Sequence, residues 1–256
     1  DLNAGDTHAF EWGAAVSEMP GAVIDGAVAT FDPSTLGDTV ASAGASVTDS
    51  GIGSLSTAAS ATIKILAAAP VLGDADTDGD GVADSAEGYG DSDNDGIPDY
   101  QDNIAETYLA PVGDSGQVIQ SDVGTTIALG DTALAGGNNE VGIDESDVGT
   151  EDEDFIYPDG LVEFEVSGAQ AGASYNIVLP LSTAVLEDAV LRKFIDANVG
   201  WQAFVENATN AVSSATAASG TCPESGSASY TAGLVLGATC IQLMIEDGGP
   251  NDADGA

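Results

Sequence analysis

Alternating apolar and polar positions dominate the first quarter of the chain. Glycine, proline, aspartate and serine separate four strand-like runs, at residues 7–14, 26–34, 38–51 and 56–66. In the first run Phe10 and Trp12 share one face. In the last run Ile63 and Ile65 face one way and Lys64 faces the other, because successive side chains of a strand point to opposite sides. This pattern predicts an antiparallel β-sheet module.

The same kind of pattern returns after the middle of the chain. Further strand-like runs lie at residues 117–121, 125–129, 161–166, 174–179, 189–194, 201–205 and 239–245. In the run 161–166, Glu163 and Glu165 alternate with apolar residues, which predicts that both glutamates face solvent. The chain is therefore expected to be all-β, with two antiparallel, immunoglobulin-like β-sandwich modules at residues 1–69 and 104–256.

An aspartate-rich segment, residues 70–103, separates these modules and predicts metal binding. Its sequence DTDGDGVADSAE is followed, fifteen residues on, by DSDNDGIPDYQD. Each copy has carboxylates at positions 1, 3, 5, 9 and 12 of a calcium loop, a glycine at position 6 and a backbone carbonyl at position 7. The candidate ligands of the first loop are Asp76, Asp78, Asp80, Val82, Asp84 and Glu87. Those of the second loop are Asp91, Asp93, Asp95, Ile97, Asp99 and Asp102.

The alternative interpretation, a solvated acidic linker, does not account for two copies in register, so we expect at least two calcium ions. An EF-hand is excluded because only Gly88, Tyr89 and Gly90 separate the loops, which leaves no room for its helices. The tandem, over residues 74–103, resembles thrombospondin type 3 repeats, and the resemblance implies metal-ligand roles for the twelve positions. It departs at Asp102, where a shorter side chain replaces the usual glutamate. Acidic stretches at residues 1–6 and 247–254 are weaker metal candidates, and ordinary turns are preferred there.

The charge of the chain limits its partners. Its 256 residues include 43 acidic and three basic residues, for a formal net charge of −40. Nucleic acids and anionic membranes are recognised through basic patches that displace counterions, so we expect neither as a partner. No apolar run reaches the length of a membrane span, so membrane insertion is not expected either. Bound cations would relieve part of the repulsion between the acids.

Two cysteines, Cys222 and Cys240, lie near the end of the chain. An even count in an acidic chain with calcium-type loops favours a disulfide and an oxidising compartment, and the alternative is a pair of buried thiols. Closing a loop of this length would stabilise the fold by about 3 kcal/mol. We therefore expect an extracellular or cell-surface protein.

Two further resemblances concern the flanking modules. The sequences DLNAGDTHAFEW and SVTDSG resemble bacterial PKD-like or cadherin-like immunoglobulin modules of surface proteins. YPDGLVEFEV, YNIVLPLSTAVLEDAVLRKFI, GWQAFVENATNAVSSA and the final TCPESGSASYTAGLVLGATCIQLMIEDGGPNDADG resemble the bacterial domain called choice-of-anchor U, over about residues 115–256. That domain sits near the C-terminus of exported proteins, so the resemblance implies a surface or exported location and no assigned chemistry.

The first module has few strands for a sandwich. Four strand-like runs are visible, whereas an immunoglobulin-like sandwich has about seven. Either the sheet is smaller or truncated, or a strand comes from elsewhere in the chain or from a neighbouring molecule by strand addition. Strand addition between copies predicts a homopolymer that grows head to tail.

No catalytic arrangement is recognisable in the sequence. The single histidine, His8, lies in a strand-like run with no nucleophile motif beside it, and phosphate-loop and zinc patterns are lacking. We therefore expect a calcium-stabilised structural protein, such as a stalk or filament subunit of a bacterial surface, and not an enzyme. The alternatives are an adhesin or carbohydrate-binding module with a glycan or surface ligand, or an accessory region of a secreted hydrolase.

Overall fold

The computed structural model describes residues 7–51, 55–113, 116–195, 198–218 and 220–253. The chain divides into two compact units, Asp1–Val71 and Leu72–Ala256. Antiparallel strands form most of the regular structure and the described helices are short. The all-β prediction is confirmed, and the division into two sandwich modules stays a prediction.

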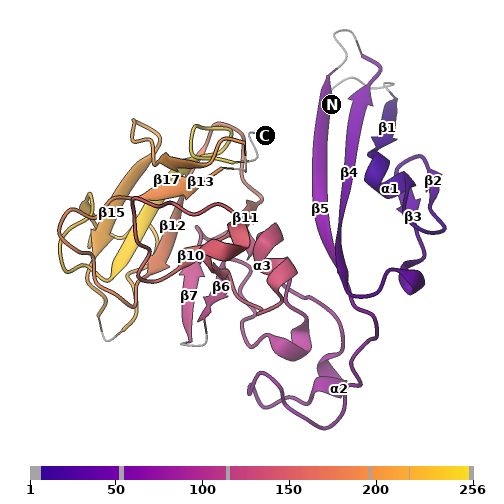
Figure 1. Cartoon of the computed structure of the whole chain (residues 1–256), viewed down its shortest axis with the longest axis horizontal. Helices are drawn as coiled ribbons and strands as arrows, with labels where there is room; N and C mark the ends of the chain where they lie inside the picture. The colour runs from indigo at the N-terminus through magenta and orange to yellow at the C-terminus, as the bar shows by residue number, and fades with distance from the viewer. Residues whose placement is uncertain (1–6, 52–54, 114–115, 196–197, 219, 254–256) are drawn as a thin grey trace. The chain divides into compact units, whose positions relative to one another are not determined.

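The first unit is built on a three-stranded antiparallel sheet. Its order is β1 (His8–Trp12), β4 (Thr39–Asp49) and β5 (Ser56–Ile65), with β4 in the middle. Figure 1 shows β4 and β5 as the two long strands of a hairpin. Between β1 and β4 the chain forms small elements, namely α1 (Ala14–Ser17), the hairpin of β2 (Val23–Asp25) and β3 (Val28–Thr30), and the 3-10 helix η1 (Pro33–Thr35).

The pairing register gives this sheet an apolar face and a polar face. The apolar face carries Phe10, Trp12, Ala41, Ala43, Ala45, Val47, Ala61, Ile63 and Ile65, together with His8, Thr39, Asp49 and Thr57 towards the strand ends. The polar face carries Glu11, Ser42, Ser46, Thr48, Ser56, Thr62 and Lys64, together with Ala9, Val40 and Ala58. The alternation read from the sequence therefore holds for both Phe10–Trp12 and Ile63–Ile65.

The apolar face of the sheet is only partly covered by its own unit. Helix α1 packs against β4, and the Trp12 indole N–H donates a hydrogen bond to the Gly26 carbonyl in the β2–β3 turn (3.0 Å). Among the described residues of this unit, the buried apolar side chains are Val16, Met19 and Ile65. Phe10, on the same face, is 41% exposed. A domain of this length normally encloses a larger core, so the cover of this face is incomplete within the described residues.

The second unit contains a six-stranded antiparallel sheet. Its order is β16 (Thr231–Ala232), β15 (Ala211–Ala215), β17 (Cys240–Glu246), β12 (Ser174–Pro180), β7 (Gln117–Gln120) and β6 (Leu109–Val112). Two-stranded sheets join β8 (Thr126–Leu129) to β11 (Phe164–Ser167), β9 (Gly142–Ile143) to β10 (Leu161–Val162), and β13 (Arg192–Phe194) to β14 (Trp201–Ala203). The described helical elements are α2 (Asp84–Glu87), η2 (Asp99–Gln101), α3 (Asp131–Gly136) and η4 (Glu145–Val148).

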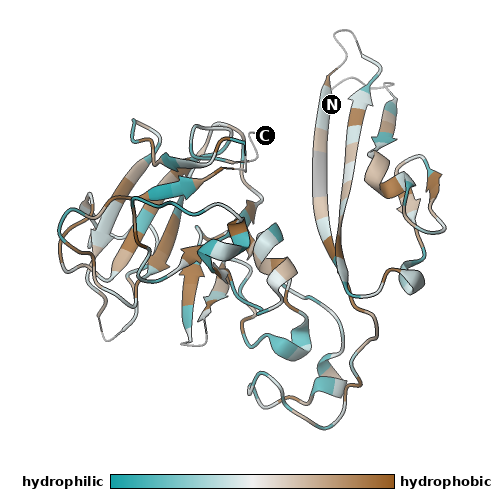
Figure 2. Cartoon of the chain, viewed as in Figure 1, coloured by the Kyte–Doolittle hydropathy of each residue, from teal (hydrophilic) through white to brown (hydrophobic). Residues whose placement is uncertain are grey.

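One apolar core holds the second unit together. Ile119 of β7, Ile127 of β8 and Ile177 of β12 are buried in it, and brown segments mark apolar residues along the sheet strands in Figure 2. Ile97, from the second aspartate loop, belongs to the same core and is 1% exposed. The second aspartate loop is therefore packed into the second unit, which begins at Leu72, and the role of the segment as a connector stays a prediction.

The two cysteines form the predicted disulfide. Cys222 and Cys240 are bonded, with their Cα atoms 5.7 Å apart. Cys240 is the first residue of β17 and is fully buried, so the bond ties a surface segment to a central strand of the sheet. A disulfide of this kind persists in oxidising compartments.

The expectation for Glu163 is wrong. The predicted strand 161–166 is divided at this residue into β10 and β11. The Glu163 carboxylate accepts hydrogen bonds from the Thr132 N–H (2.6 Å), the Thr132 hydroxyl (2.9 Å) and the Ala133 N–H (2.8 Å) at the start of α3. The first N–H groups of a helix lack hydrogen-bond partners within the helix, and the Glu163 carboxylate is such a partner for α3. Strand alternation cannot reveal a contact with so distant a part of the chain.

Candidate metal centre

The first aspartate loop is shaped by backbone hydrogen bonds to its own carboxylates. Asp76 accepts from the N–H groups of Gly79 (2.8 Å) and Gly81 (3.2 Å), and Asp78 accepts from the Asp80 N–H (3.2 Å). Gly81 has a φ of 98°, which side-chain-bearing residues rarely adopt, and this explains the glycine at position 6. Together these turns bring the carboxylates at positions 1, 3 and 5 close together.

The second loop repeats this arrangement. Asp91 accepts from the N–H groups of Asp95 (3.2 Å) and Gly96 (3.1 Å), and Asp95 accepts from the Ile97 N–H (2.7 Å). Gly96 has a φ of 95°, close to the value at Gly81. The repeated sequence spacing thus corresponds to a repeated backbone conformation.

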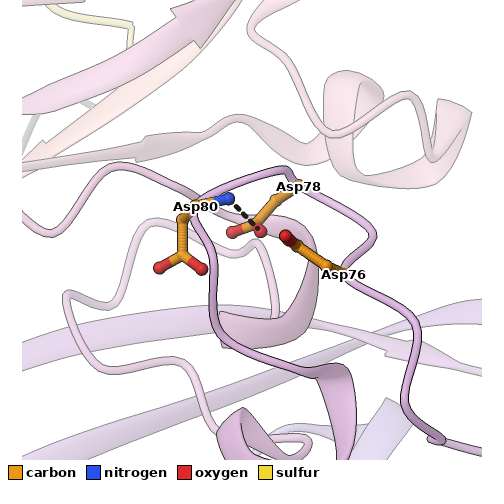
Figure 3. Close-up of side chains that lie close together, drawn as sticks. All are labelled: Asp76, Asp78 and Asp80. Carbon is orange, nitrogen blue, oxygen red and sulfur yellow. Dashed lines mark hydrogen bonds between the residues drawn. The ribbon is translucent and has the colours of Figure 1, made fainter.

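Each loop brings three carboxylates together. Figure 3 shows the first cluster, made by Asp76, Asp78 and Asp80, whose ligand atoms all lie within 4.8 Å of one another. The second cluster meets the same limit and consists of Asp91, Asp93 and Asp95. Like charges at such distances repel strongly, and a cation between them would reverse this. Both clusters therefore have the chemistry to hold a metal ion.

Buried oxygens without hydrogen-bond partners provide independent evidence for a ligand. Within the described residues the buried, unpartnered side-chain oxygens are Asp78 Oδ2, Glu87 Oε2, Asp93 Oδ2 and Asp95 Oδ2. All four belong to predicted ligand positions, two in each loop. Leaving a buried carboxylate oxygen without a partner is costly, and a bound cation would provide the missing interaction.

Burial and mutual repulsion raise the pKa of several of these carboxyls. Burial raises the pKa of Asp95 to about 8, and repulsion from Asp93 and Asp102 adds to the effect. Burial likewise raises the pKa of Asp102 to about 6, with repulsion from Asp93 and Asp78. The pKa values of Asp78, Glu87 and Asp93 are also raised, first by burial and then by neighbouring carboxylates. A nearby divalent cation favours the ionised form and opposes all of these shifts.

The aspartates at position 9 brace the loops. Asp84 accepts hydrogen bonds from the N–H and the hydroxyl of Thr77, both at 2.9 Å. Asp99 accepts the same two bonds from Ser92, at 2.7 and 2.9 Å. Both oxygens of each carboxylate are thus engaged by the residue at position 2, and neither aspartate is part of a three-carboxylate cluster. Direct coordination by Asp84 and Asp99 stays a prediction.

Sequence reasoning missed Thr77 and Ser92. A signal for them was present, because both copies of the repeat have a hydroxyl side chain at position 2 and an aspartate at position 9. A hydroxyl and its own amide can bind the two oxygens of one carboxylate. The pair therefore closes each loop across seven residues without using the metal.

The acids at position 12 face the clusters. Glu87 is close enough to Asp78 and Asp80 for their charges to raise its pKa. Asp102, the shorter residue, experiences the charges of Asp93 and Asp91 in the same way. Asp102 also accepts a hydrogen bond from the Ile104 N–H (3.0 Å) through one oxygen. Both acids are half-buried, and neither belongs to a three-carboxylate cluster, so direct coordination by Glu87 and Asp102 stays a prediction.

The two loops contact each other directly. The Asn103 side-chain amide donates a hydrogen bond to the Asp78 carbonyl (3.1 Å), and the rings of Tyr89 and Tyr100 meet edge to face with centroids 6.2 Å apart. The charge of Asp78 also raises the pKa of Asp102 in the other loop. The two candidate sites thus lie next to each other within the second unit.

The position-7 residues differ in environment. Val82 is 43% exposed, whereas Ile97 enters the core of the second unit. The Leu129 N–H of β8 donates to the carbonyl of Asp95 (2.8 Å), which fastens the second loop to the sheet region. Ligation by the carbonyls of Val82 and Ile97 stays a prediction.

The weaker acidic candidates do not form comparable clusters in the described chain. Residues 1–6 and 254 lie outside the described residues. In the tail, Asp252 accepts from the Gly248 N–H (2.7 Å) and Asn251 donates to the Val205 carbonyl (2.8 Å). The first bond closes a local turn, and the second ties the tail to a distant segment of the same unit.

Comparisons with protein families, with curated proteins and with solved structures give no match to this chain. None of the helices among the described residues is long and apolar enough to cross a membrane. The chemistry of the two aspartate loops is therefore the main basis for assigning a function.

Proposed function

We propose that both loops bind calcium and that the chain is a calcium-stabilised structural protein of a bacterial surface or its surroundings, such as a stalk or filament subunit. The observation that carries this proposal is the set of buried, unpartnered carboxylate oxygens in the loops. Calcium binds six to eight oxygens, and carboxylates and backbone carbonyls are its usual ligands in proteins.

The type of donor supports calcium over other metals. Every clustered side chain in the two loops is a carboxylate, and neither histidine nor cysteine joins the clusters found among the described residues. Zinc, copper and iron sites normally use nitrogen or sulfur donors. Magnesium usually keeps several waters and needs fewer protein ligands than these loops offer.

The mechanical consequence follows from how the loops are held. The second loop is fixed to the core by Ile97, and the first loop contacts the second through Asn103. Without a cation, the repelling carboxylates favour an extended segment. With ions bound, the segment keeps one conformation, so that metal binding and folding are thermodynamically linked. A segment fixed in this way suits a protein with a structural role better than one that transmits a signal.

The disulfide supports a location outside the cytoplasm. Cys222 and Cys240 are bonded, which is expected of secreted and surface proteins. Extracellular calcium modules bind with dissociation constants of about 10⁻⁴ to 10⁻³ M. Calcium would then be a permanent part of the structure at the concentrations found outside cells.

Thermal unfolding in calcium and in a chelator tests the proposal. At calcium concentrations about 100 times the dissociation constant, each site adds about 2.7 kcal/mol of stability. Two sites should then raise the Tm by roughly 10 to 20 °C for a unit of this size. An equal Tm with calcium and with EDTA would rule out occupied loops.

A matched pair of variants locates the binding. Asp80→Ala removes a member of the first carboxylate cluster, whereas Ser85→Ala changes a nearby exposed residue outside it. Isothermal titration calorimetry should show two sites in the wild type and in Ser85→Ala, and one weakened site in Asp80→Ala. Equal titrations for the two variants would place the ions elsewhere.

A further inference from the structure

The sheet of the first unit has two different edges. Among the described strands, β4 lies in the middle, so β1 forms one edge and β5 forms the other. The edge of a sheet presents backbone groups that can pair with a strand of another molecule. Natural proteins usually shorten, cover or charge such edges, and β5 is a ten-residue strand without proline.

The two edge strands have matching patterns. Residues 8–12 read HAFEW and residues 61–65 read ATIKI. Phe10 and Trp12 lie on the apolar face, as do Ile63 and Ile65. Aligned in parallel, the two strands would continue the apolar face of the sheet on one side and its polar face on the other.

The same alignment brings opposite charges together. Residues 8–12 contain the acidic Glu11, and residues 61–65 contain the basic Lys64. Both side chains lie on the polar face and are exposed. Lys64 is one of only three basic residues in a chain of net charge −40. Two copies of so acidic a chain repel each other over most of their surface. An edge with a lysine and no acid is therefore the most favourable place for a second copy to approach.

Within one copy, these two residues cannot meet. Glu11 pairs with Ser46 of β4 and Lys64 pairs with Val40, six residues earlier in the same strand. At about 3.3 Å per residue the two positions are roughly 20 Å apart along the sheet. A contact between Glu11 and Lys64 thus requires two molecules.

We propose that β5 of one copy pairs in parallel with β1 of a second copy, with Lys64 next to Glu11 and Ile63 next to Phe10. The contact extends the sheet and covers Phe10, which is 41% exposed in the single chain. Each copy has one β1 edge and one β5 edge, so the contact is heterologous and repeats head to tail. This inference deepens the proposed structural function by naming its partner, and it rests on that function.

Charge exchange tests the pairing in the full-length chain with calcium present. We expect Glu11→Lys and Lys64→Glu each to weaken association by about threefold to tenfold, because each places like charges side by side across the contact. The double variant restores the opposite pair and should return association close to the wild-type value. Sedimentation velocity over a concentration series measures the effect.

The control is Glu18→Lys, which makes the same charge change at an exposed residue outside the two edge strands. It should associate like the wild type. If Lys64 instead protects the edge from pairing, Lys64→Ala will associate more strongly than the wild type, and the proposal is overturned. A wild type that stays monomeric at about 100 μM in calcium also overturns it.

Cysteine cross-linking distinguishes the proposed pairing of β5 with β1 from other pairings of the edge strands. The double variant with Glu11→Cys and Lys64→Cys should give a ladder of covalent oligomers on mild oxidation, while each single variant should not. Dimers from Lys64→Cys alone would indicate that β5 pairs with itself, which contradicts the proposed contact. Melting curves with and without EDTA, recorded on the same variants, report the calcium proposal separately from assembly.

Discussion

The two aspartate loops share one motif and differ in how they are supported. Both have a glycine with a φ near 95° at position 6, three clustered carboxylates and a position-9 aspartate held by a position-2 hydroxyl. The second loop places Ile97 in the core and is bonded to β8 through Asp95. The first loop exposes Val82 and is linked to the second through Asn103, the residue that follows it.

The difference shows which features of an aspartate loop its repeated motif determines. Ligand spacing sets the backbone turns, so equivalent positions in the two loops adopt equivalent conformations. The apolar side chain at position 7 is not a predicted ligand, because that position contributes its backbone carbonyl, so the side chain can contact other parts of the protein. Its burial decides whether a loop is part of the core or a surface appendage. The second loop should therefore fold with the unit and the first should be the less stable of the two.

The largest expected effect comes from the position-7 side chains. Ile97→Ala should reduce the free energy of unfolding by about 2 to 4 kcal/mol, because it leaves a cavity in the core. Val82→Ala should cost less than about 0.5 kcal/mol, since that side chain is largely exposed. Urea unfolding of both variants in saturating calcium measures the difference. Equal losses would mean that the first loop is supported as firmly as the second.

Neutralising Asp95 should have opposite effects with and without calcium. In calcium, Asp95→Asn should cost about 2.7 kcal/mol through the loss of one site. The folded pKa of Asp95 is about 8, above its ordinary value of 3.8, so the metal-free protein loses stability as the pH rises between these values. In EDTA, Asp95→Asn should therefore raise the Tm at pH 7 and leave it unchanged near pH 4.

The matched variant in the first loop is Asp80→Asn, whose side chain is exposed. It should weaken calcium binding but raise the metal-free Tm less than Asp95→Asn does, because less burial is relieved. Differential scanning calorimetry at both pH values covers the whole set. A metal-free Tm that falls in Asp95→Asn would contradict the role of burial at this site.

The sequence predicted which carboxylates cluster better than it predicted their surroundings. Spacing alone identified the carboxylates that cluster, because the loop is local and its glycine requirement is strict. It also identified the disulfide and the all-β class. The burial of Ile97, the capping of α3 by Glu163 and the link from Asn103 to the first loop depend on residues far apart in the chain. Contacts between such distant residues produce no periodic pattern in the sequence.

The position-2 hydroxyls should have a moderate effect that is similar in both loops. Ser92→Ala removes one hydrogen bond to Asp99, and Thr77→Val removes the equivalent bond to Asp84 while keeping the shape of the side chain. Each should cost about 1 to 1.5 kcal/mol in calcium. The Tm of each variant, measured against Ser85→Ala, gives the comparison. No loss in either variant would mean that the brace is unimportant once the metal is bound.

The smallest expected effect concerns the link between the loops. Asn103→Ala removes the bond to the Asp78 carbonyl and should weaken calcium binding in the first loop by about twofold to fivefold. The second loop, which is fixed to the core, should be unaffected. Calorimetric titration of Asn103→Ala beside Gln101→Ala resolves the two sites. A change in calcium affinity confined to the second loop would contradict the expectation that Asn103 supports the first.

The hydrogen bond from Leu129 to Asp95 has a consequence for synthesis. A ribosome makes the chain from its N-terminus, so both aspartate loops emerge before the strand that holds the second loop in place. Until β8 and the core strands that follow it are complete, Ile97 has nothing to pack against. The acidic segment therefore leaves the ribosome as an open chain, and its second candidate metal site is completed only after the core strands that follow it have folded.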